Sequence, residues 1–317
     1  MKRILVCIGF VFLLFGSLIS FSANLHWMSL AWIVVAMVAL AQSKPAWPWL
    51  VGLTSILLIK RTGLTVELFA LIFVLLAVSI WDGMVRKKND ELASKKQLVV
   101  GFCFLLGALT IFSIIRWVKT NPSNKLEQDG RPIACLGDSL TDYGYPQDLE
   151  KLLAVPVADF GVDGITTDDG IEMISEILAS DPQLVVIELG GHDYNGDHKT
   201  RADTKKNLVT LIEAFQNASV DVILVEIPRG FISDPYDGLE RELAAKYNLK
   251  LIDDSLIRNL IFYSPIMPPG MWLDSSRQYS NDGLHPNELG NKYFAQTVAR
   301  ALVDVYGEAI LKPELAE

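Results

Sequence analysis

The chain has 317 residues, of which 50% are hydrophobic, and carries 37 Asp and Glu against 28 Lys and Arg, for a formal net charge of −9. Residues 1–118 hold 11 of the basic and 4 of the acidic side chains, so this part is net positive and the rest is strongly acidic. An acidic segment of this size lacks the Lys and Arg clusters that bind nucleic acid, which excludes nucleic acid as an expected partner.

Apolar blocks fill most of the first 118 residues. They lie near residues 4–22, 27–42, 46–59, 64–81 and 98–118. Most of them approach the roughly 20 residues that a helix needs to cross a bilayer. We therefore predict that residues 1–118 form a transmembrane region of about five helices, among which 46–59 is the shortest block.

The Lys and Arg residues between these blocks predict an orientation, because short cytoplasmic loops carry the excess of positive charge. Five spans with the N-terminus inside place eight of them in the cytoplasm: Lys2, Arg3, Lys44, Arg86, Lys87, Lys88, Lys95 and Lys96. Only Lys60 and Arg61 then face outward between spans. The domain after Val118 is expected on the extracytoplasmic side, whether or not the first block is a signal peptide cleaved near Ser22.

A polar linker is expected at 119–131, and short apolar runs then alternate with longer amphipathic ones. The candidate strands are 133–136, 157–160, 184–189, 220–227 and 249–252, and the candidate helices are 145–154, 168–179, 202–217, 237–247 and 287–305. Strand and helix in alternation predict a parallel sheet with helices on both faces. The expected fold of residues 132–317 is therefore one three-layer α/β/α domain.

Polar, glycine-containing segments follow the predicted strands, at the edge where parallel sheets place their sites. They are Gly137-Asp138-Ser139-Leu140, Gly161-Val-Asp-Gly164 and Gly190-Gly-His192-Asp193, and Asp282-Gly-Leu-His285-Pro286 precedes the last helix. Ser139, His285 and Asp282 supply the three residue types of a nucleophile, its base and the carboxylate that orients the base. The glycines let backbone N–H groups approach a reacting carbonyl, as an oxyanion hole requires.

These motifs resemble the GDSL, or SGNH, hydrolase family, over about residues 131–306. Within it, Leu136-Gly-Asp-Ser-Leu-Thr141, Glu188-Leu-Gly-Gly191 and Asp282-Gly-Leu-His-Pro-Asn287 are most similar to periplasmic thioesterase and lysophospholipase-like esterases. The resemblance implies Ser139 as nucleophile, His285 as base and Asp282 as its orienting partner. It also implies oxyanion donors from the Ser139 and Gly164 backbones.

The chain departs from this family at His192, where the family usually has an Asn that donates the third oxyanion hydrogen bond. An imidazole N–H can also donate, although a neutral ring donates from one nitrogen only. We expect His192 to replace the Asn. The alternative is an enzyme weakened at this position, since one such donor is typically worth about 10²–10³ in rate.

Simpler interpretations stand beside the catalytic one. Ser139 alone could be a helix N-cap. His192, Asp193, Asp197 and His198 could bind a metal, but no remote ligand is evident, so we expect a polar loop with no metal.

The three cysteines, Cys7, Cys103 and Cys135, are too few for a disulfide framework and are expected to be small buried hydrophobes. The apolar segment 262–273 is expected to wall the site, to meet a bilayer or to be packed surface.

The expected function is that of a membrane-anchored extracytoplasmic serine esterase that cleaves carboxylic esters of a lipid, a thioester or an acylated glycan through an acyl-serine intermediate. This chemistry needs no cofactor. The substrate is a small molecule or lipid, and no protein partner is assigned. Two alternatives remain open: acyl transfer to a cell-surface glycan, and a non-catalytic binding module with a degenerate oxyanion hole.

Overall fold

The computed structural model describes residues 9–14, 16–17, 31–32, 34–36, 38–39, 48–49, 51–53, 126–230, 234–236, 238–267 and 270–315. The chain divides into two compact units. One comprises Met1–Ile115 and Gly230–Asp237, and the other comprises Arg116–Arg229 and Gly238–Glu317. The second unit holds all the motifs named above.

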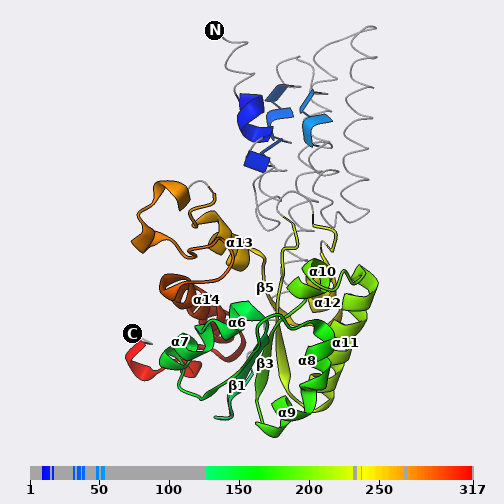
Figure 1. The fold of residues 1–317 in the computed structure, drawn as a ribbon, viewed down its shortest axis with the longest axis vertical. Helices are drawn as coiled ribbons and strands as arrows, with labels where there is room; N and C mark the ends of the chain where they lie inside the picture. Colours follow the sequence, from blue (N-terminus) through cyan, green and yellow to red (C-terminus); the bar gives the residue numbers. More distant parts are fainter. Residues whose placement is uncertain are drawn as a thin grey trace, which may run out of the picture. The chain divides into compact units, whose positions relative to one another are not determined.

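A five-stranded parallel sheet forms the centre of the second unit (Figure 1). Its strands are β1 (Ile133–Gly137), β2 (Val157–Gly161), β3 (Leu184–Glu188), β4 (Asp221–Val225) and β5 (Lys250–Ile252), in the order β2-β1-β3-β4-β5. All five residues of β1 and of β3 are buried. These two strands read as unbroken apolar runs because helices cover both faces of a parallel sheet.

Nine α-helices accompany the sheet within the described part of this unit (Figure 1). They are α6 (Ser139–Asp142), α7 (Tyr145–Leu152), α8 (Thr167–Glu172), α9 (Ile174–Ala179), α10 (Gly191–Asn195), α11 (Arg201–Asn217), α12 (Leu239–Tyr247), α13 (Ser255–Phe262) and α14 (Glu288–Tyr306). The 3₁₀ turns are η1 (Gly270–Trp272), η2 (Ser275–Arg277), η3 (Glu308–Ile310) and η4 (Pro313–Leu315).

The helices form two layers, one on each face of the sheet. On one face α14 packs against α7 and β5, and α13 packs against α14. On the other face α11 packs against α8, α9, α12 and β4. Alternate residues of β1 therefore enter different cores: Ile133 and Cys135 join the core under α7 and α14, whereas Leu136 lies on the face of α8 and α11.

The predicted α/β/α class and the parallel sheet are confirmed by this architecture. The strands begin and end within two residues of their predicted bounds. The predicted helix 168–179 is interrupted at Met173, which divides it into α8 and α9. Three helices were not predicted, α6, α10 and α13, and the first two are too short to show a helical period in the sequence.

The membrane prediction falls mainly outside the described residues. Blocks 64–81 and 98–118 lie wholly outside them, and the first three blocks are described in fragments. In those fragments the Trp32 indole donates a hydrogen bond to Ser17 (2.9 Å) and packs edge-on against Phe10. No helix within the described ranges has both the length and the apolar character to cross a bilayer. The five-span region and the linker boundary at 119–131 stay predictions.

Candidate active site

Three neighbouring strands end side by side at one edge of the sheet. Gly137 of β1 is in register with Gly161 of β2 and with Glu188 of β3. The segments that follow these strands carry Ser139 at the start of α6, Gly164 in a loop and His192 in α10. The topology thus brings three of the predicted site residues to the same edge, where parallel sheets bind their ligands.

Ser139 is the first residue of α6, and its neighbour Asp138 is the N-cap. The Asp138 carboxylate accepts a hydrogen bond from the Leu140 backbone N–H (3.1 Å). The capping role that serine could have filled is therefore taken by aspartate, so the simpler interpretation of Ser139 as an N-cap is wrong. Ser139 is 4% exposed and stands where backbone N–H groups of a helix N-terminus favour negative charge.

Gly137 and Gly161 allow close packing around the turn that leads from β1 into α6. A Cβ on Gly161 would lie 2.4 Å from the Asp142 backbone nitrogen, and a Cβ on Gly137 would lie 2.8 Å from a Glu188 carboxylate oxygen. Gly164 differs, because a Cβ there would meet no atom within 4 Å. Its φ of 76° is the left-handed region that favours glycine, and it turns the loop after β2.

The buried carboxyl groups of Glu188 and Asp138 both contact α6. Glu188 is fully buried, and one of its oxygens accepts a hydrogen bond from the Thr141 hydroxyl (3.1 Å). Burial raises the pKa of Glu188 well above its usual value, and the charge of Asp138 raises it further. Burial also raises the pKa of Asp138, against the Leu140 N–H and the nearby histidines, His192 and His285, which lower it. Glu188 therefore keeps its proton to a higher pH than an exposed glutamate does.

The Asp282–His285 turn brings a carboxylate and an imidazole into direct contact. Asp282 Oδ2 lies 2.8 Å from His285 Nδ1. Asp282 Oδ1 accepts from the backbone N–H groups of Leu284 (2.8 Å) and His285 (2.9 Å) and from the Ser280 hydroxyl (3.0 Å). Because Nδ1 faces a carboxylate, the proton of the neutral ring belongs there, which leaves Nε2 as the acceptor.

The pKa of Asp282 lies well below its ordinary value. Partial burial acts to raise it, but the hydrogen bonds from the His285 ring, the two backbone N–H groups and Ser280 outweigh that effect. Asp282 is thus ionised across the pH range in which histidine titrates. It can orient the imidazole and stabilise the imidazolium that forms when His285 takes a proton.

The His285 turn also lies against α6. The Tyr143 ring, one residue past the end of α6, stacks on the imidazole with ring centroids 4.5 Å apart and an interplanar angle of 12°. No hydrogen bond joins the Ser139 hydroxyl to the His285 ring in the described part of the chain. Catalytic hydrogen bonds are often long in the resting enzyme and shorten in the Michaelis complex.

His192 lies in the first turn of α10, half-buried. The N-cap of this helix is Gly190, whose φ of 115° is left-handed. The Arg229 guanidinium holds this glycine: its Nε donates to the Gly190 carbonyl (2.9 Å), and its Nη2 forms a buried ion pair with Glu240 (2.6 Å). A Cβ on Gly190 would lie 2.5 Å from Arg229, so the loop before His192 requires glycine here.

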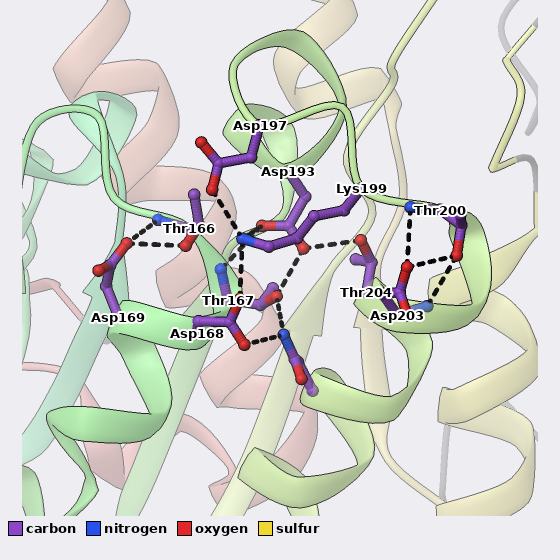
Figure 2. Close-up of polar contacts among 11 residues, drawn as sticks. Thr166, Thr167, Asp168, Asp169, Asp193, Asp197, Lys199, Thr200, Asp203 and Thr204 are labelled. Atoms are coloured by element: carbon purple, nitrogen blue, oxygen red, sulfur yellow. Dashed lines mark hydrogen bonds and ion pairs between the residues drawn. The ribbon is translucent and has the colours of Figure 1, made fainter.

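A buried threonine and carboxylate network fixes the other side of α10 (Figure 2). Asp193 is fully buried and accepts from the Thr167 N–H (2.8 Å), the Thr167 hydroxyl (2.5 Å) and the Thr204 hydroxyl (2.7 Å). The Lys199 ammonium lies 3.0 Å from Asp168, 3.1 Å from Asp197 and 3.9 Å from Asp193. This network ties α10 to the first turns of α8 and α11.

The same network includes part of the His and Asp cluster that the sequence singled out. The Asp193 carboxylate accepts hydrogen bonds from the hydroxyls of Thr167 and Thr204. His198, in contrast, is exposed, and its Nδ1 lies 3.1 Å from the Tyr194 carbonyl oxygen. Lys199 supplies the positive charge between the carboxylates. Within the described ranges no group of three or more His, Cys, Asp or Glu side chains is arranged to hold a metal ion.

The apolar segment 262–273 is described except for residues 268–269 and lies beside the Asp282–His285 turn. A Cβ on Gly283 would lie 2.2 Å from Ile266 Cδ1, so Ile266 packs directly on that turn. The Gln278 side chain donates to the Gly270 carbonyl (3.0 Å) and fixes η1. Met271 and Trp272, at the end of η1, are 54% and 77% exposed.

The fold and the site together describe a parallel-sheet hydrolase with its polar residues at the carboxyl edge. Residues 135–293, half of the chain, match the sequence profile of the GDSL-like lipase/acylhydrolase family. The chain therefore belongs to this family. The expectation of an esterase-type hydrolase is confirmed at this level.

Several known proteins are similar to the chain. An acetylxylan esterase from Xylanibacter ruminicola is 25% identical over 234 residues, which cover 59% of this chain and 45% of that protein. The chain thus spans less than half the length of this relative. A lipase/acylhydrolase from Enterococcus faecalis is 25% identical over 58% of this chain and 98% of its own, with a TM-score of 0.42. A GDSL-like lipase from Bacteroides thetaiotaomicron is 18% identical over 56% and 91%, with a TM-score of 0.43.

Sequence reasoning assigned no role to four residues that support the site: Tyr143, Glu188, Arg229 and Lys199. Glu188 could have been found from the sequence, since it is the acidic residue that ends the apolar run of β3. Lys199 left a weaker signal, as a cation among several aspartates. Tyr143 and Arg229 left none, because their contacts depend on packing between segments that are distant in the chain.

Proposed function

We propose that this chain is a serine esterase in which Ser139 is the nucleophile, His285 the base and Asp282 the carboxylate that orients the base. The observation that carries this proposal is the Asp282–His285 contact beside α6, whose first residue is Ser139. The N-cap position is occupied by Asp138, which leaves the Ser139 hydroxyl available. Family membership supports the same reaction class.

The reaction runs in two halves. His285 Nε2 takes the Ser139 proton as Oγ attacks the ester carbonyl, and the same proton then passes to the departing alcohol or thiol. Water next attacks the acyl-serine with His285 again as base, and the acid leaves as Ser139 regains its proton. The oxyanion of each tetrahedral intermediate accepts from the Ser139 and Gly164 N–H groups and from the His192 ring.

The substrate we propose is an acylated glycan, a lipid ester or a thioester. The glycan ester is favoured by the similarity to a protein named as an acetylxylan esterase. The lipid and thioester options draw on the motif resemblance and on two apolar side chains, that of Ile266, which packs on the Asp282–His285 turn, and that of Leu284, which lies within it. We further propose that residues 1–118 anchor the enzyme in the membrane with this domain on the extracytoplasmic side, on the evidence of the apolar blocks and the Lys and Arg distribution.

The test is hydrolysis of p-nitrophenyl esters of graded acyl length by the full-length chain in a mild detergent. We expect Ser139→Ala to abolish turnover, and His192→Ala to lower kcat by about 10²–10³, the effect of one oxyanion donor. A maximum at acetyl would favour the glycan ester, and a maximum at long chains a lipid. A folded wild type with no turnover beyond that of Ser139→Ala would contradict the proposal and favour acyl transfer or binding.

A further inference from the structure

Tyr143 joins the two segments that carry the proposed nucleophile and base. Its backbone N–H donates to the Ser139 carbonyl (3.0 Å), which closes the single turn of α6. Its own carbonyl accepts from the Asn291 side chain of α14 (2.7 Å). The helix that begins after the His285 turn is therefore bonded to the end of the helix that begins with Ser139.

The Tyr143 ring continues this connection to the imidazole itself. The two rings are nearly parallel, and the separation of 4.5 Å between their centroids is at the short end of the range for stacked aromatic pairs. Asp282 restrains the imidazole through one edge, at Nδ1, and Tyr143 restrains it through one face. A hydrogen bond at one nitrogen still permits the ring to tilt about that bond, and a flat partner on its face limits the tilt.

The stack also matters for charge. The face of a phenol ring carries negative electrostatic potential and attracts a cation placed over it. As the proposed base, His285 becomes an imidazolium when it takes the Ser139 proton. Stabilisation by the ring face is therefore larger in the transition state than in the ground state, which is the condition for raising kcat.

From this geometry we infer that Tyr143 is a positioning residue for catalysis, which stacks on His285 to hold Nε2 toward Ser139 and to stabilise the imidazolium. The inference rests on the proposed function, since it needs His285 to act as the base. The active part of Tyr143 is its ring face. The hydroxyl makes no hydrogen bond within the described ranges and has no role in it.

The test compares three substitutions in the full-length chain with p-nitrophenyl acetate. We expect Tyr143→Ala and Tyr143→Leu to lower kcat about tenfold with KM unchanged within about twofold, and Tyr143→Phe to keep wild-type kcat. Tyr143 is 49% exposed, so unfolding midpoints should change little. Tyr247→Ala, at the distant end of α12, is the matched control and should keep wild-type kinetics. Wild-type kcat in Tyr143→Ala, a loss confined to KM, or a Phe variant as slow as Ala would each overturn the inference.

A second readout separates this inference from the proposed function. The chain has four histidines, so the His285 ring protons can be assigned in ¹³C–¹H spectra with His285→Gln. A stacked tyrosine shifts these protons upfield, and Tyr143→Leu should remove the shift while Tyr143→Phe keeps it. The shift without Ser139-dependent turnover would support the stack and refute the esterase. Turnover without the shift would refute the stack and leave the esterase standing.

Discussion

Glu188 shows how one buried side chain can link stability to pH. Its pKa is raised by burial and by Asp138, so the folded chain holds the proton to a higher pH than the unfolded chain, which ionises Glu188 near its usual pKa of about 4.3. Between these two pKa values folding takes up a proton. The stabilising contribution is therefore complete below pH ~4 and decreases as the pH rises toward the folded pKa.

Glu188→Gln tests this linkage, because glutamine has the same shape and is neutral at every pH. We expect the free energy of unfolding of the wild type to fall relative to the variant as the pH rises from about 4 toward the folded pKa, by up to about 1.4 kcal/mol per pH unit. Thermal or urea unfolding at several pH values measures it. Glu308→Gln, at an exposed position, is the control and should follow the wild type. Parallel wild-type and Glu188→Gln curves would mean that Glu188 is ionised when folded.

At the residue scale, motifs in the sequence predicted which residues gather at the site but not what surrounds them. Asp282 and His285 share one turn, so their contact was readable from the spacing of three. The capping by Asp138 was not, because Asp138 and Ser139 are both favoured N-caps and the sequence does not say where the helix begins. The stack of Tyr143 on His285 joins residues far apart in the chain, so no local pattern signals it.

At the scale of elements, α10 is a short helix held by bonds outside itself. Five residues are too few for a stable isolated helix, so its position depends on Arg229 before it and on Asp193 within it. Asp193 accepts three hydrogen bonds from Thr167 and Thr204 in a fully buried setting (Figure 2). The proposed oxyanion residue His192 precedes Asp193 directly, so this network sets its place.

Asp193→Asn should disturb both stability and catalysis. The amide replaces an acceptor oxygen by a donor and leaves buried donors of Thr167 or Thr204 without a partner, at a cost of about 3 kcal/mol. We expect a lower unfolding midpoint and a lower kcat, as α10 shifts with His192. Asp197→Asn is the matched control, since Asp197 also contacts Lys199 but is largely exposed, and it should change neither quantity appreciably. Equal effects of the two substitutions would remove the special role of Asp193.

Elements long enough to show a period were predictable, and short ones were not. Strands β1 to β5 follow from apolar runs, and α11 and α14 from amphipathic patterns. α6 and α10 have four and five residues, less than two helical turns, so their existence is decided by capping and tertiary bonds. α13 does carry a helical pattern in Leu256, Ile257 and Leu260, all buried, and sequence reasoning overlooked it.

At the scale of the whole molecule, the proposed extracytoplasmic location can be tested by chemical labelling. Cys7 and Cys103 lie in predicted spans and Cys135 is buried in β1, so the wild type should give little background. We expect an impermeant maleimide to label Thr210→Cys, on the exposed side of α11, in intact cells. Ser94→Cys, in a predicted cytoplasmic loop, should react only after permeabilisation. The reverse pattern would place the domain in the cytoplasm.

The sequence predicted the layers of the catalytic unit but not the order of its strands. Alternating strands and helices require a parallel sheet, whereas the order β2-β1-β3-β4-β5 depends on which helices pack on which face. The place of β1 between β2 and β3 is what makes the loops of Ser139, Gly164 and His192 neighbours. Convergence at one edge was predicted from the general rule for parallel sheets.

Ser139 follows the first strand, whereas His285 comes after the last strand and directly before the final helix. During synthesis Ser139 is therefore translated early, before most of the unit has been made. In the proposed mechanism Ser139 has no base until the segment of His285 has folded with α14, which packs against α7. We therefore expect a chain that still lacks α14 to be inactive toward esters. If the domain is exported as proposed, the reaction would begin only in the compartment where the last helix folds.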